Sequence, residues 1–286
     1  MSKDSGLVAV VTGASRGAGK GIAIALGEKG ATVYVTGRTT KEGQFFLPGT
    51  VYETAEQVTK AGGKGIAVIC DHADDSQVKA LFDQVEKESG GLDILVNNVA
   101  VIHDDLIKPG GFWEKPLDLV DILDVGLRSQ YVASYYAAPL MVKRKSGLIV
   151  FTSSFGSVCY MHGAAYGAQK AGVDKFAADM AVDLKPHNVA AVSIWMGPLW
   201  TSRTEWASKE RPEQYGEFMK IAETPEFTGR VIHALYNDPN LMELSGQTLI
   251  GAEAAEKYGI QDKGKQPPSY RSALGEPRIP HPAIVQ

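Results

Sequence analysis

Short apolar runs rich in β-branched residues alternate with longer helical segments along most of this chain. The runs are almost continuously apolar, which is typical of parallel strands covered on both faces. Strands are expected at residues 7–11, 32–35, 65–69, 92–96, 148–151, 189–195 and 247–250. Crossover helices are expected at residues 17–29, 51–61, 76–89, 117–145 and 164–184. The alternation predicts an α/β fold, a doubly wound, Rossmann-like parallel sheet of about seven strands in a single domain.

Three inserts interrupt the alternation, and each follows the carboxyl end of an expected strand. They span residues 39–50, 103–116 and 197–228 and contain glycine, proline and aromatic residues. Ligands bind at this edge of a doubly wound sheet. We expect one domain over residues 1–262 that includes the insert 197–228. Residues 263–286 are polar and rich in proline, which predicts an extended tail packed on the surface or on a partner subunit.

Charge and cysteine content exclude several classes of partner. The 29 basic and 33 acidic residues give a net charge of -4, which offers no field to gather nucleic-acid phosphates. The two cysteines, Cys70 and Cys159, lack the spacing of a zinc site or a disulfide framework, and the six histidines lack ligand spacing. No apolar stretch reaches the roughly 18 residues of a membrane span. We expect a cytoplasmic protein with no metal, no membrane span and no nucleic-acid partner.

A glycine loop at residues 12–19, Thr-Gly-Ala-Ser-Arg-Gly-Ala-Gly, joins the first expected strand to the first expected helix. Glycines allow close backbone approach and a helix N-terminus attracts anions, so a pyrophosphate is expected here. A P-loop is excluded because Gly21 follows Gly19-Lys20 where a serine or threonine is required. The spacing also departs from G-x-G-x-x-G, and a loop that only packs the helix is the alternative. The candidate contacts are Gly13, Ser15, Arg16, Gly17, Ala18 and Gly19.

The end of the second expected strand bears on the choice of dinucleotide. An NAD site places an acidic residue there to bind the ribose hydroxyls. This chain has Gly37-Arg38-Thr39 instead, and Arg16 is positioned in the loop to add a second guanidinium. Arginine binds a phosphate dianion, whereas a carboxylate repels it. NADP(H) is therefore favoured over NAD(H), although a solvated charge is the alternative for Arg38 alone.

Tyr166 and Lys170 lie four residues apart, on one face of an expected helix. A cation near a phenol favours the phenolate, so Lys170 is expected to lower the pKa of Tyr166 below its usual value of about 10 and to make it a usable acid and base. A packed ring beside a lysine stem is the common alternative for such a pair. His103 and His162 are placed to reach the same cleft.

The glycine loop, Asn97-Asn98, Ser153 and Tyr166-x-x-x-Lys170 together resemble the short-chain dehydrogenase/reductase family over residues 6–260. The family's serine lies thirteen residues before its tyrosine, which selects Ser153 over Ser154. More narrowly, residues 91–98, 112–116, 244–247 and 257–259 resemble the branch called dehydrogenase/reductase family member one.

The resemblance implies an NADP(H)-dependent oxidoreductase that interconverts a carbonyl and an alcohol. Tyr166 is the implied acid, Ser153 a hydrogen-bond donor to the same oxygen, and Lys170 a ligand of the nicotinamide ribose. The insert 197–228 becomes the substrate loop. Family members pair through the helices at 117–145 and 164–184, so a homodimer or homotetramer is expected. Further cofactor contacts implied by the resemblance are Thr39, Asp71, His72, Asn98, Val99, Gly197 and Thr201.

Three positions depart from the family pattern. Val99-Ala100 replaces Ala-Gly, Met196 replaces the proline before Gly197, and Gly126 stands where the family has the asparagine that holds a relay water. A backbone carbonyl is the expected substitute for that asparagine. These departures favour, as an alternative, a dinucleotide-binding sensor or scaffold with weak or no turnover. Dehydration or epimerisation is a further alternative, but no extra acid or base supports it.

Overall fold

The computed structural model describes residues 6–285, and all seven expected strands form within two residues of their predicted bounds. They make one parallel sheet in the order β3-β2-β1-β4-β5-β6-β7. The predicted fold class is confirmed. The strands are β1 (Val8–Val11), β2 (Thr32–Gly37), β3 (Lys64–Ile69), β4 (Ile94–Asn97), β5 (Gly147–Ser153), β6 (Val189–Trp195) and β7 (Thr248–Ile250).

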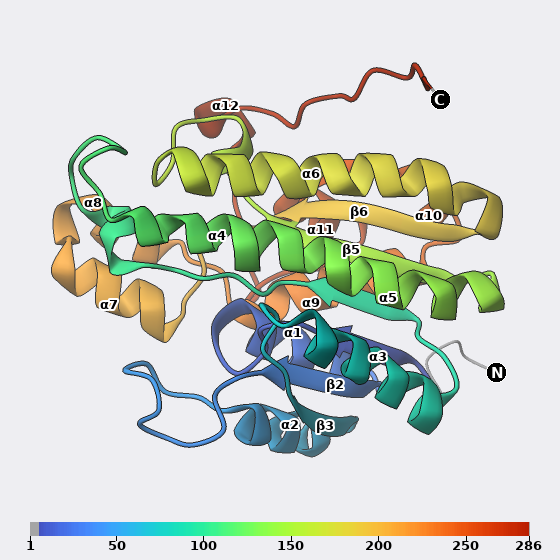
Figure 1. The fold of residues 1–286 in the computed structure, drawn as a ribbon. Helices are drawn as coiled ribbons and strands as arrows, with labels where there is room; N and C mark the ends of the chain where they lie inside the picture. The colour runs from blue at the N-terminus through green and yellow to red at the C-terminus, as the bar shows by residue number, and fades with distance from the viewer. Residues whose placement is uncertain (1–5, 286) are drawn as a thin grey trace.

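Helices cover both faces of the sheet, which explains why the strands are apolar on both sides (Figure 1). In β1, Ala9 and Val11 join one buried cluster, whereas Val8 and Val10 join the other, because successive side chains of a strand alternate. The first cluster includes residues of α1 (Gly17–Gly27), α2 (Val51–Lys60), α9 (Pro225–Asn237) and α11 (Gly251–Lys257). The second includes residues of α3 (Asp75–Ser89), α5 (Ser129–Arg144) and α6 (Ala164–Leu184).

The long helix expected at 117–145 forms without interruption over residues 117–144, but its hydrogen-bond pattern changes along its length. It consists of a 3₁₀ turn at Leu117–Val120, α4 (Asp121–Leu123), a π-helical turn at Asp124–Arg128, and α5. Gly126 lies in the π turn, and its carbonyl accepts a hydrogen bond from Gln169 Nε2 at 2.8 Å. A Cβ at Gly126 would lie 3.0 Å from Gln169 Cγ. The glycine thus admits the Gln169 amide, and π turns of this kind are frequent at functional sites.

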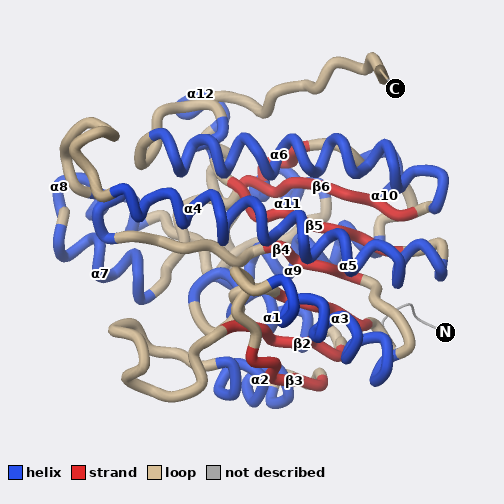
Figure 2. The backbone as a smooth tube through the Cα atoms, viewed as in Figure 1, coloured by secondary structure: helices blue, strands red, loops and turns tan. Residues whose placement is uncertain are grey.

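The inserts gather beyond the carboxyl ends of the strands, at the left of Figures 1 and 2. Residues 39–50 contain no helix or strand, and the second insert holds a 3₁₀ turn at Asp104–Ile107. The insert predicted at 197–228 contains α7 (Ser202–Glu210) and α8 (Pro212–Lys220), and its last residues already belong to α9. This insert is therefore mainly helical and ends near Thr224.

After α10 (Leu241–Leu244), β7 and α11, the chain from residue 263 onward is mostly extended, with one helical turn, α12 (Arg271–Leu274). Arg271 pairs with Glu253 of α11 at 2.7 Å, and the ring of Tyr270 lies 6.3 Å from that of Phe155. These contacts hold the first part of the tail beside the loop that follows β5. None of the helices in the described part of the chain is long and apolar enough to cross a membrane.

Candidate active site

The glycine loop is closed by backbone contacts that leave no room for side chains. A Cβ at Gly13 would lie 2.7 Å from Val99 Cα, and one at Gly19 would lie 2.5 Å from both Asn98 Nδ2 and the Gly13 carbonyl. Gly13 and Gly17 also have φ values of 64° and 58°, which favour glycine. The N-cap residue of α1, Arg16, makes no side-chain hydrogen bond to the first N–H groups of the helix, which leaves them available to an anion. The loop fits a pyrophosphate.

Asn98 and Val99 close this loop from the neighbouring strand. β1 and β4 are adjacent, at the point where the strand order reverses. Thr12 Oγ1 accepts hydrogen bonds from the backbone N–H of Asn98 at 2.9 Å and of Val99 at 3.0 Å. Asn98 Nδ2 donates to the Thr12 carbonyl at 2.9 Å. The sheet order therefore brings together segments that lie 86 residues apart.

Arg38 follows the end of β2, and Arg16 lies in the glycine loop close by. The two guanidinium groups differ in exposure and in how many of their N–H donors are already engaged. Arg38 is 64% exposed, and its Nη1 lies 3.5 Å from Asp71 Oδ2. Arg16 donates to the carbonyls of Pro48 and Gly49 and to Thr39 Oγ1, at 2.9–3.2 Å. These hydrogen bonds fix the insert 39–50 to the glycine loop and occupy most of the N–H donors of Arg16. The geometry therefore does not favour the expected role of Arg16 as a second phosphate contact. Arg38 is the more accessible guanidinium.

Two further predicted contacts, Asp71 and His72, follow β3 and point to different places. Asp71 is partly exposed beside Arg38. The His72 side chain is instead buried, and its Nε2 lies 2.8 Å from Thr36 Oγ1. Burial lowers the pKa of His72 to about 4. The imidazole is therefore enclosed beside Thr36 of β2. Only the backbone of His72 is left to contact a cofactor.

The serine that meets Tyr166 is Ser154, not the predicted Ser153. Ser154 Oγ lies 2.9 Å from the Tyr166 hydroxyl. Ser153 is the last residue of β5, fully buried, and donates to the Lys170 carbonyl at 3.3 Å. Neighbouring residues at a strand end point to opposite sides, so an error of one residue exchanges the two roles. A fixed count of thirteen residues fails when the connection between strand and helix differs in length by one.

Lys170 is buried beneath Tyr166. Its Nζ donates to the Thr152 carbonyl at 3.3 Å and lies 5.4 Å from the centre of the Tyr166 ring. Burial lowers the pKa of Lys170 to about 8, opposed by Asp174. The expected lowering of the Tyr166 pKa is wrong for the protein alone: burial raises the pKa of Tyr166, and the Ser154 hydrogen bond only partly opposes this.

Gly197 and Thr201 begin the third insert. The Cγ2 atom of Thr201 is the nearest atom, at 4.0 Å, to a Cβ built on Gly17, so α7 starts beside the glycine loop. A Cβ at Gly197 would lie 2.5 Å from Oε1 of Glu223, which has no hydrogen-bond partner among the described residues. Burial raises the pKa of Glu223 to about 8, with the nearby Asp262 adding to the effect. The Glu223 carboxyl group therefore packs directly against the backbone of Gly197, the first residue of the third insert.

Aromatic rings extend the site beyond Tyr166. The His162 ring packs edge-on against Tyr166, with centroids 5.0 Å apart, so the expectation for His162 is confirmed. Tyr215 of α8 stacks on His162 at 6.4 Å. Three residues near the site were not predicted from the sequence as site residues: Tyr215, Glu223 and Gln169. The sequence offered a signal only for Gln169, which directly precedes Lys170. Tyr215 and Glu223 are far from the motif in sequence and reach the site through tertiary packing.

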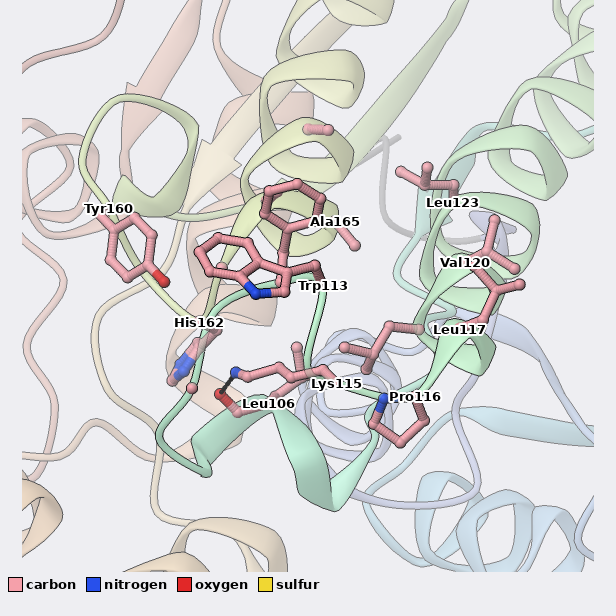
Figure 3. Close-up of a pocket in the computed structure, with 16 residues that line it drawn as sticks. Leu106, Trp113, Lys115, Pro116, Leu117, Val120, Leu123, Tyr160, His162 and Ala165 are labelled. Atoms are coloured by element: carbon pink, nitrogen blue, oxygen red, sulfur yellow. Dashed lines mark hydrogen bonds between the residues drawn. The ribbon is translucent and has the colours of Figure 1, made fainter.

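A cavity of about 540 Å³ lies beside these rings (Figure 3). It is bounded by the insert 103–116, by residues 117–123 and by the start of α6. A smaller hollow of about 240 Å³ adjoins it and shares His162 and Lys115. Across residues 6–285, no three His, Cys, Asp or Glu side chains cluster as metal ligands would.

Known proteins resemble this chain along most of its length. The short chain dehydrogenase family model matches residues 7–212. Dehydrogenase/reductase SDR family member 1 from Mus musculus is 41% identical over 281 residues, covering 94% of this chain and 87% of that protein. Its counterpart from Homo sapiens is 41% identical, covering 92% of this chain and 85% of that protein.

Among solved structures, a putative dehydrogenase from Xanthomonas campestris is 26% identical with a TM-score of 0.77, covering 95% of this chain and 96% of that one. A putative short-chain alcohol dehydrogenase from Sinorhizobium meliloti is 27% identical with a TM-score of 0.72, covering 86% and 95%. The sheet order, the glycine cradle and these similarities lead to one conclusion: the chain belongs to the short-chain dehydrogenase/reductase family of oxidoreductases, which use a nicotinamide dinucleotide.

Proposed function

We propose that this protein is an NADP(H)-dependent oxidoreductase that reduces a ketone or aldehyde to an alcohol, or catalyses the reverse reaction. The observation that carries the proposal is the contact of 2.9 Å between Ser154 Oγ and the Tyr166 hydroxyl. Two hydroxyl groups held at this distance can both reach one carbonyl oxygen. Lys170 lies beneath the phenol, 5.4 Å from its ring.

In the reducing direction, Tyr166 donates its proton to the carbonyl oxygen, and Ser154 donates a hydrogen bond to that oxygen while negative charge develops. When bound, the reduced nicotinamide supplies the hydride. The phenolate left on Tyr166 is then stabilised by the Lys170 ammonium and takes up a proton from solvent. Ser153 acts only through the backbone of Lys170, so it is a positioning residue in this scheme.

The glycine loop would hold the dinucleotide pyrophosphate through Gly13, Gly17 and Gly19 and the N-terminus of α1. The preference for NADP(H) is supported by the accessible Arg38 and by the absence of an acid at the end of β2. Other proposed cofactor contacts are Ser15, Ala18, Thr39, Asp71, the backbone of His72, Asn98, Val99, Tyr166, Lys170, Gly197 and Thr201.

The reaction is tested by NADPH consumption against a panel of ketones and aldehydes. We expect Tyr166→Phe to lower kcat/KM by about 10² to 10⁴, the range that general acid catalysis contributes. Tyr52→Phe is the matched control because Tyr52, on α2, is 52% exposed and lines neither the cavity nor the adjoining hollow. Unchanged turnover in Tyr166→Phe would assign the acid elsewhere.

Cofactor choice has a separate test. We expect Arg38→Ala to weaken NADPH binding about tenfold, because one exposed charge-assisted contact to the phosphate is lost. Binding of NADH should change little. A preference for NADH that Arg38→Ala leaves intact would contradict the phosphate assignment. Calorimetric titration of the wild type and Arg38→Ala with each dinucleotide measures these affinities without any turnover.

The alternative of a sensor or scaffold predicts a different outcome. Such a protein would bind the dinucleotide, yet the wild type would match Tyr166→Phe on every carbonyl tested. The close Ser154–Tyr166 contact favours an enzyme. The carbonyl of Gly126, which holds Gln169, supplies a backbone acceptor at the position of the missing asparagine.

We further propose one catalytic domain over residues 1–262 with a surface tail, a cytoplasmic location, and a homodimer or homotetramer that pairs through α5 and α6. The outward faces of these helices expose Tyr131, Tyr135 and Val182, which supports the pairing. Small-angle scattering measures the oligomeric state directly, and a monomer would overturn this part of the proposal.

A further inference from the structure

The cavity of about 540 Å³ is lined mainly by apolar side chains. In Figure 3, Trp113 and Leu117 lie on opposite sides of it, with Lys115 and His162 toward one end. Phe112, Trp113 and Leu117 are 71%, 74% and 86% exposed. Its volume falls in the range of small-molecule sites, roughly 300–1,000 Å³. Exposed apolar walls around a hollow of this size favour a ligand with an apolar body.

The charged side chains at this end of the cavity and in the adjoining hollow are all positive. Among residues 6–285, no aspartate or glutamate lines the cavity or the adjoining hollow, whereas Lys108, Lys115 and Arg211 line one or both. Lys108 is paired with Asp105 at 2.8 Å, and Arg211 with Glu213 at 2.6 Å. Among the described residues, Lys115 has no carboxylate within ion-pair distance, and its Nζ only donates to the Leu106 carbonyl at 3.4 Å.

His162 connects this end of the cavity to the active site. It lines both hollows, and its ring packs 5.0 Å from that of Tyr166. Burial lowers the pKa of His162, and the positive charges of Lys115 and Lys170 lower it further. Both effects favour the neutral imidazole, so Lys115 is the cation without an ion pair that is left at this end of the cavity to bind an anionic ligand.

We propose that the carbonyl substrate carries a carboxylate on an apolar body, and that Lys115 binds this carboxylate while Trp113 and Leu117 cover the body. The inference rests on the proposed function, since it places the reacting carbonyl at Tyr166, on the other side of His162. Asp105 interacts electrostatically with Lys115 but forms its ion pair with Lys108, so a neutral substrate would leave the Lys115 ammonium without an ion-pair partner of its own, which charge complementarity disfavours.

The kinetic test compares 2-oxodecanoate, whose carbonyl lies next to its carboxylate, with its methyl ester, in the full-length protein with NADPH. We expect Lys115→Gln to raise KM for the acid about tenfold, to leave kcat nearly unchanged, and to leave the ester unaffected. Lys87→Gln on α3 removes the same charge from an exposed position outside the inserts and should change the KM for neither substrate. Equal KM values for acid and ester in the wild type, with no effect of Lys115→Gln on either, would overturn the inference.

A binding test separates this inference from the proposed function. Decanoate, which has no carbonyl to reduce, is titrated calorimetrically into Tyr166→Phe and into the same variant with Lys115→Gln. Weaker binding in the double variant supports the anion site even if Tyr166→Phe retains turnover, a result that would contradict only the reaction. If decanoate does not bind, and Leu117→Asp converts a dimer to a monomer in scattering, the cavity is an interface between copies and the inference fails.

Discussion

The two sides of the active site are built in different ways. On the nucleotide side, backbone meets backbone: a methyl group on Gly13 or Gly19 would lie within 2.7 Å of neighbouring atoms. On the substrate side, Phe112, Trp113 and Leu117 stand largely in solvent, and a methyl group on Gly216 of α8 would have no atom within 4 Å. A pyrophosphate has one shape, so a close backbone cradle suits it. Open apolar inserts instead leave the choice of substrate to side chains.

The largest effect within this comparison is expected at the two serines that end β5. Ser154→Ala should lower kcat by about 10² to 10³, the range for loss of one donor to a developing oxyanion. Ser153→Ala should change kcat only a few-fold and reduce the free energy of unfolding by about 1 kcal/mol, because it loses one buried hydrogen bond. Steady-state kinetics and denaturant unfolding on both variants measure these effects. The reverse pattern would restore Ser153 as the reacting serine.

A smaller effect is expected when one methyl group is added on either side. Gly19→Ala should destabilise the fold by about 1–3 kcal/mol and weaken dinucleotide binding, because the new Cβ meets the Gly13 carbonyl at 2.5 Å. Gly216→Ala should stabilise α8 by up to about 1 kcal/mol, since the position is helical and open. Thermal unfolding and NADPH titration measure both. Equal effects of the two substitutions would remove the contrast between the two sides.

The smallest effect concerns Glu223, which lies behind Gly197 where the two sides meet. Its pKa is about 8 in the folded protein against an ordinary 4.5, so the folded state binds this proton more tightly than the unfolded state. The resulting stability is complete below pH 4.5 and is lost as pH rises toward 8. Lys170, with a pKa of about 8 against 10.5, adds stability only as pH rises from 8 to 10.5, so it acts in a separate window.

Glu223→Gln should therefore flatten the dependence of Tm on pH between 5 and 8, by about 2–4 °C at the upper end. Asp262 and Tyr270 interact with Glu223 electrostatically in the wild type. Glu256→Gln, at an exposed position of α11, is the matched control. A Tm profile identical to that of the wild type would show that Glu223 is not protonated on folding in this window.

The strands could be predicted to within two residues because nearly continuous β-branched runs are their direct cause. The π turn within the helix at 117–144 could not, because there Gly126 packs against Gln169 and accepts a hydrogen bond from it, and Gln169 lies 43 positions away in the sequence. The candidate site shows the same division. Tyr166 and Lys170 share a face by helical period alone, whereas the role of Arg16 depends on backbone carbonyls of the insert 39–50, which engage its guanidinium.

The sequence by itself determined the α/β alternation, the glycine loop and the Tyr166–Lys170 pair, since each follows from local spacing along the chain. Only the tertiary structure decided which serine faces Tyr166, which arginine is accessible, and that Lys115 stands without a carboxylate at the end of an apolar cavity. The physical reason is that periodicity fixes the direction of side chains within one element. The register between elements and the burial of charge depend on how distant segments pack together.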